Sequence, residues 1–110
     1  MGTIQFLVQG SAVDPYEVTF QKAGNNLSAF CTCAAGQNGQ YCKHRFQILE
    51  GNAEGIVSGN IEQVSAVVAW LPGTDVAEAM AVLDVAEREF DRTKKVVTNA
   101  KKNLASAMRS

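Results

Sequence analysis

The amino-acid sequence predicts an α+β fold, with an N-terminal antiparallel β-meander and a short helix followed by a helical C-terminal segment. Three observations predict this. Apolar and polar residues alternate between turns over residues 3–33. All three cysteines and the single histidine of the 110 residues gather in residues 31–44. Finally, neither Gly nor Pro occurs between Val76 and Met108. We expect two domains, residues 1–52 and residues 53–110.

Three strands are expected in the first domain. The clearest places Tyr16, Val18 and Phe20 on one face and polar residues on the other, which is typical of a half-buried strand. Gly, Asn, Asp and Pro cluster on both sides of it, where turns are expected. In chain order the expected elements are the strand 3–9, the turn 10–15, the strand 16–21, the turn 23–26 and the strand 27–33.

A short helix is expected after the cysteines. Phe46 and Leu49 recur at i, i+3 within residues 43–50, and Gly51 provides a C-terminal stop. The glycine-containing residues 53–60 are then expected to form a linker or a loop.

Two further helices are expected in the second domain. Asn60 is placed to cap a helix over residues 61–71, which Pro72 ends. Asp75 is followed by Glu78 three residues later, which is the spacing of a capping box. We therefore expect Asp75 to start the long helix.

The long helix has a seven-residue period. Large residues recur at one heptad position and small residues recur three positions later. The large residues are Val76, Leu83, Phe90, Val97 and Leu104, and the small ones are Ala79, Ala86, Thr93, Ala100 and Ala107. A sustained seven-residue repeat implies a partner helix, and the small residues allow it to come close. The sequence therefore predicts a coiled-coil-like helix that mediates self-association.

Charge is divided along this helix. Its first half carries Asp75, Glu78, Asp84, Glu87, Glu89 and Asp91 with Arg88, and its second half carries Arg92, Lys94, Lys95, Lys101, Lys102 and Arg109. An antiparallel pair of helices would match acid with base, whereas a parallel pair would bring like charges together. We therefore expect an antiparallel homo-oligomer. The alternative is a single helix folded back on residues 61–71 and on the first domain.

The cysteine stretch has the spacing C-x-C-x8-C-x-H. Cys31 and Cys33 are two residues apart on an expected strand, so both sulfurs point to one face. Cys42 and His44 must lie before the short helix or in an irregular first turn. Four N/S ligands in two pairs predict a closed tetrahedral Zn²⁺ site with these four residues as ligands and no open position for a catalytic water.

Other interpretations of the same residues remain open. Cys31 and Cys33 could be small buried strand residues, since free cysteine packs well in a core. Cys42 could form a disulfide with one of them. His44 could be a surface histidine beside Lys43 and Arg45.

The ligand spacing, the Cys-Lys-His string and the apolar residues Phe46, Ile48 and Leu49 after it resemble the SWIM zinc finger. The resemblance covers roughly residues 16–50. It implies zinc binding in a ββα-like unit, with DNA binding or protein–protein interaction and no catalysis. The chain would be a free-standing small protein of this type, because nothing else in it matches an attached ATPase or transposase domain.

Composition excludes several function classes. The sequence has no Walker loop, no dinucleotide-binding glycine motif, no nucleophile elbow and no second histidine for a proton relay, so we expect no enzyme. A net charge of −1 argues against a dedicated nucleic-acid binder. No apolar run reaches the roughly 18 residues that span a bilayer, and no signal peptide is recognisable. We expect a cytoplasmic location, or a nuclear one in a eukaryote, and no membrane partner.

The expected function is that of a zinc-binding adaptor that self-associates through its last helix and binds another macromolecule with the finger. Lys43 and Arg45 flank His44 and are the expected contacts for a protein or nucleic acid. The alternative is a nucleic-acid-binding protein of replication, recombination or transcription. The helix lysines are expected to form a solvated face.

Overall fold

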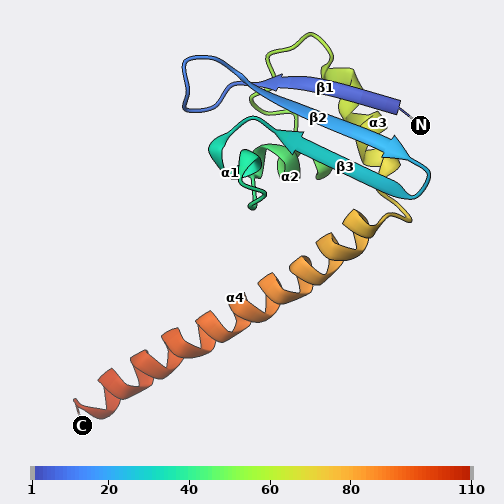
Figure 1. Ribbon diagram of the computed structural model, residues 1–110. Coiled ribbons are helices and arrows are strands. Elements are labelled where there is room, and N and C mark those ends of the chain that lie inside the picture. Colours follow the sequence, from blue (N-terminus) through green and yellow to red (C-terminus); the bar gives the residue numbers. More distant parts are fainter. Residues whose placement is uncertain (1, 110) are drawn as a thin grey trace. The chain divides into compact units, whose positions relative to one another are not determined.

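The computed structural model describes residues 2–109 and contains three strands and five helical segments (Figure 1). The expected α+β class is confirmed. In chain order the elements are β1 (Gly2–Val8), β2 (Tyr16–Ala23), β3 (Asn26–Cys31), α1 (Ala34–Gln37), α2 (Lys43–Leu49), the 3₁₀ helix η1 (Ile61–Gln63), α3 (Val64–Trp70) and α4 (Asp75–Ala107).

The strands form one antiparallel sheet in the order β1-β2-β3, as the meander prediction requires. The register places Phe6 beside Val18 and Ile4 beside Phe20. All four side chains are buried, and the residues between them in the strands are mostly exposed. The alternation in the sequence therefore corresponds to one buried and one solvated face of the sheet.

A two-residue turn at Gly24-Asn25 joins β2 to β3, and Gly24 adopts φ +61°. A tight hairpin turn of the type that matches strand twist needs positive φ at its first central position, which glycine adopts without strain. This turn sets the register that brings Cys31 beside Val18.

Short helices on one side of the sheet complete the core. Phe6 and Phe20 meet edge-to-face with ring centroids 6.1 Å apart. The helices contribute the buried residues Ile48, Leu49, Val64 and Val67. The first compact unit of the chain spans Met1–Ala77, and in it α3 packs against α2 and the Trp70 ring lies beside Gly2 of β1. It therefore extends further than the 1–52 domain expected from the sequence.

The loop after α2 protects one edge of the sheet. Gln9 N donates to Gly55 O at 2.8 Å, and Val57 N donates to Leu7 O at 2.8 Å. Ile56 in this loop is buried. The loop 53–60 thus belongs to the fold of the first unit rather than acting as a linker between units.

Two helix starts differ from the sequence prediction. Asn60 precedes η1 without capping it, because its side-chain oxygen accepts instead from Ser58 Oγ at 2.6 Å. Its side-chain amide donates to Gln5 O at 2.8 Å. At α4 the cap is Thr74, one residue earlier than expected: its hydroxyl accepts from Ala77 N at 3.2 Å. Thr74 is buried, so this cap is fixed by the packing of the first unit.

The second compact unit, Glu78–Ser110, consists mainly of α4. The predicted long helix is confirmed at Asp75–Ala107. Every described residue from Ala81 onward is exposed. Among residues 2–109 no single helix is long and apolar enough to span a membrane, although Ile61–Trp70 and Asp75–Ala107 meet the length and composition criteria when taken together as a bent pair.

Candidate metal centre

The four predicted zinc ligands converge on one point. The sulfurs of Cys31, Cys33 and Cys42 and a ring nitrogen of His44 all lie within 4.8 Å of one another. The Cys33 and Cys42 sulfurs are 3.3 Å apart, and His44 Nδ1 lies 3.5 Å from the Cys42 sulfur and 3.7 Å from the Cys31 sulfur. All three cysteines are buried free thiols, so the disulfide interpretation is wrong.

These distances fit a tetrahedral zinc ion. With Zn–S near ~2.3 Å and Zn–N near ~2.0 Å, ligand atoms of such a site lie about 3.5 to 3.8 Å apart. The donor set of three thiolates and one imidazole is also one that zinc prefers. The cluster therefore fits Zn²⁺, with Cys31, Cys33, Cys42 and His44 as the ligands.

Secondary-structure ends position the ligands. Cys31 is the last residue of β3, and Cys33 lies beyond the strand as the N-cap of α1, so the expected third strand ends earlier than residue 33. Cys33 keeps an extended backbone, with φ −64° and ψ 161°. Cys42 is the N-cap of α2 and His44 lies in its first turn, as the spacing required.

Two glycines shape the loop between the ligand pairs. Gly39 adopts φ +70° where the chain turns back toward Cys42. Gly36 lies so close to Cys31 that an added Cβ would be 2.5 Å from Cys31 O. Its N–H also lies 3.3 Å from the Cys33 sulfur, in position to donate a hydrogen bond to it. The short helix α1, which the sequence did not predict, therefore depends on glycine at this position.

Tyr16 and Gly10 pack against the His44 imidazole on the side away from the cysteine sulfurs. Its ring packs against Tyr16 with centroids 4.9 Å apart. An added Cβ at Gly10 would lie 2.6 Å from the Tyr16 ring and 3.2 Å from His44 Nε2. This close packing orients Nδ1 toward the sulfurs, which is the usual role of residues behind a metal ligand.

The thiols of Cys31 and Cys42 have pKa values that are shifted in opposite directions. Burial raises the pKa of the Cys31 thiol to about 12. Burial also acts to raise the pKa of Cys42, but the Arg45 backbone amide and the side chains of Cys33, Cys31 and His44 outweigh it and lower that pKa to about 6. Without a metal the site thus favours a thiolate at Cys42 and a neutral thiol at Cys31.

Zinc affinity is expected to rise with pH, because zinc displaces the Cys31 proton and binds the thiolate. Since the pKa of Cys31 is about 12, this displacement contributes up to about tenfold per pH unit across the neutral range. Below about pH 6 Cys42 also binds a proton, so the dependence becomes steeper. Chelator competition at pH 5.5, 7.0 and 8.0 measures this. An affinity unchanged over that range would contradict it.

The two basic residues beside His44 have different surroundings. Lys43 is exposed. Arg45 is partly buried, and its guanidinium donates to Ala29 O at 3.2 Å and to Gln40 O, while its Nε is buried without a partner among the described residues. Arg45 thus connects α2 to β3 and to the loop before Cys42, a role that the sequence did not reveal.

Replacing Arg45 with alanine is expected to destabilise the first unit by about 1–3 kcal/mol, because two carbonyl oxygens lose a charged donor. Replacing the exposed Lys43 with alanine should change stability by less than about 0.5 kcal/mol. Thermal unfolding of the two zinc-loaded variants compares them directly. Equal stability would show that the Arg45 contacts contribute nothing.

The residues predicted for self-association lie on α4. Val76 is partly buried at the start of the helix. Leu83, Phe90, Val97 and Leu104 are exposed.

Comparison with protein families agrees with the ligand geometry. Residues 16–45 match the family model of the SWIM zinc finger. The match contains all four ligands, which the structure clusters as a metal site. The resemblance drawn from the sequence is thereby confirmed for this segment. Curated proteins and solved structures give no match to the chain.

Proposed function

We propose that the protein is a zinc-stabilised adaptor that self-associates through α4 and binds another macromolecule with its finger. The observation that carries this is the pairing of a closed Cys3His cluster with a long helix whose apolar residues are uncovered. Four protein ligands complete a zinc tetrahedron, so the metal stabilises the fold and has no position for a reacting water.

The helix supports self-association. Apolar stripes of this length are rarely left exposed on monomeric soluble proteins, where they mark interaction sites. The stripe repeats every seven residues, as in helices that pair with other helices. Metal analysis together with mass measurement in solution tests both parts: the proposal expects one zinc ion per chain and a mass above that of the monomer.

Nucleic-acid binding by the finger is the second candidate. Its support is the exposed Lys43 near the exposed ring of Tyr41, which stacks on Phe46 with centroids 4.4 Å apart. Basic and aromatic groups together are typical of surfaces that bind single-stranded nucleic acid. Binding driven by phosphates should weaken steeply as salt rises, and Lys43→Glu should weaken it further. The absence of any binding at low salt would remove this candidate.

A further inference from the structure

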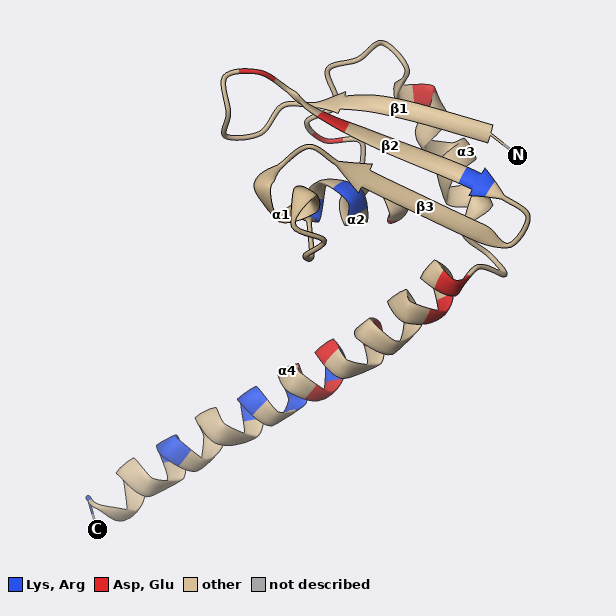
Figure 2. Ribbon diagram, in the orientation of Figure 1, with Lys and Arg blue, Asp and Glu red and all other residues tan. Residues whose placement is uncertain are grey.

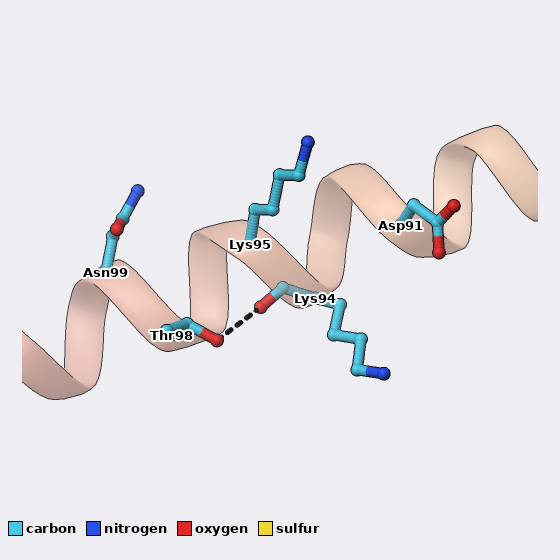
Figure 3. Close-up of a pocket in the computed structure, with 5 residues that line it drawn as sticks. All are labelled: Asp91, Lys94, Lys95, Thr98 and Asn99. Atoms are coloured by element: carbon cyan, nitrogen blue, oxygen red, sulfur yellow. Dashed lines mark hydrogen bonds between the residues drawn. The ribbon is translucent and has the colours of Figure 1, made fainter.

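One face of α4 is apolar and uncovered. Leu83, Phe90, Val97 and Leu104 are between 37% and 66% exposed. The side of the helix that carries Asp91, Lys95 and Asn99 is polar. Figure 3 shows the side chains of Asp91, Lys94, Lys95 and Asn99 extending away from the helix, while Thr98 Oγ1 donates to Lys94 O at 3.0 Å. These groups can stay in contact with water, so the apolar face is the side that a partner would cover.

We propose that a second copy of this chain covers the apolar face in antiparallel orientation and in one register, with Phe90 of each copy opposite Thr93 of the other. The inference rests on the proposed self-association and adds to it the register. In this register each large residue of the stripe meets a small one. The layers are Val76 with Ala107, Leu83 with Ala100, Phe90 with Thr93, Val97 with Ala86, and Leu104 with Ala79.

Packing favours this register. Paired helices keep a nearly constant separation of about 8–10 Å, so layers of similar total volume pack best. In the antiparallel register every layer combines one large and one small side chain. A parallel pair would instead stack Phe90 on Phe90 and Ala86 on Ala86, and it would alternate crowded layers with empty ones.

A hollow on the helix surface borders the proposed interface at Ala86. It has a volume of about 440 Å³ and is lined by Ala81, Val82, Val85, Ala86 and Glu89. In the proposed register Val97 of the second copy lies opposite Ala86. A branched apolar side chain would thus pack at the edge of a mostly apolar hollow.

Charge complementarity favours the same arrangement. Figure 2 shows acidic residues along the first half of α4 and basic residues along the second half. Antiparallel pairing places these halves against each other. Glu87 of one copy then flanks the seam beside Lys94 of the other, and symmetry repeats the pair. Lys94 already lies next to the stripe, with its Nζ 5.9 Å from the centroid of the Phe90 ring.

The arrangement makes the adaptor bivalent. Each copy of α4 is preceded in its own chain by a zinc module. At 1.5 Å per residue the helix is about 50 Å long, so the two helix starts lie at opposite ends of the pair. The two fingers would thus be held apart rather than side by side, a spacing that suits a partner with repeated binding sites.

Cysteine cross-linking tests the register. Leu83→Cys and Ala100→Cys are made as separate single variants, loaded with zinc so that the native cysteines are ligated, and oxidised alone and as an equal mixture. The expected result is a cross-linked dimer in the mixture and at least tenfold less in either variant alone. Thr93→Cys mixed with Leu83→Cys is the register control and should not cross-link, and the wild-type chain should not either.

Any other cross-linking result overturns the proposed antiparallel register. Cross-linking of Leu83→Cys with itself means a parallel pair, and cross-linking with Thr93→Cys means a shifted one; in both cases self-association stands. A monomeric mass for the wild-type chain would remove the register and the self-association together. If a cysteine variant fails to associate, charge-reversal variants test the register instead. Glu87→Lys and Lys94→Glu should each weaken the dimer roughly 5- to 30-fold. Mixing the two variants should restore dimer formation, because each then meets the opposite charge. No restoration overturns the proposal.

Discussion

Replacing Cys42 with serine is expected to unfold the first unit while leaving the helical signal of α4. Structural zinc contributes on the order of 10 kcal/mol to small zinc modules, so a domain with this small core should not stay folded without a complete ligand set. Circular dichroism of the zinc-containing and chelator-treated protein separates the two contributions. The expected spectrum keeps most of its helical signal and loses the sheet.

The control for this variant is Gln37→Ser, which changes an exposed residue between the two ligand pairs. It should bind zinc and unfold like the wild type. Complete and simultaneous loss of all secondary structure in Cys42→Ser would contradict the independence of the two units. Full retention of the fold would show that the metal is not structural.

Replacing Phe90 with aspartate is expected to weaken self-association by more than about 100-fold, because a carboxylate buried at the seam without a partner costs several kcal/mol. Asn99→Asp is the matched control, since it adds the same charge on the polar face of α4 (Figure 3). Sedimentation over a range of concentrations measures both variants. Equal association of the two would mean that the apolar face of α4 is not the interface.

The parts of the structure that the sequence predicted depend on local signals. The alternation around Val18 and Phe20 sets one buried face of the sheet. The ligands were predictable because each sits at the end of a strand or helix, where a spacing of two residues brings both side chains to one side. The heptad repeat of α4 can likewise be recognised without knowing how the rest of the chain folds.

The features that the sequence did not predict depend on contacts between segments that are far apart in the chain. Arg45 reads as a free surface charge until β3 and the loop before Cys42 are folded around it. Thr74 becomes the helix cap because tertiary packing buries it, although Asp75 has the stronger sequence signal. In the sequence Gly36 looks like a flexible loop residue. In the structure glycine is needed there because the backbone lies too close to Cys31 to leave room for a side chain.

Native mass spectrometry of the zinc-loaded chain tests zinc binding and self-association together, because it reads metal content and oligomeric state from one species. We expect a dimer with one zinc ion per chain, which loses its zinc in the presence of a strong chelator. A metal-free monomer at micromolar concentration and neutral pH would contradict it.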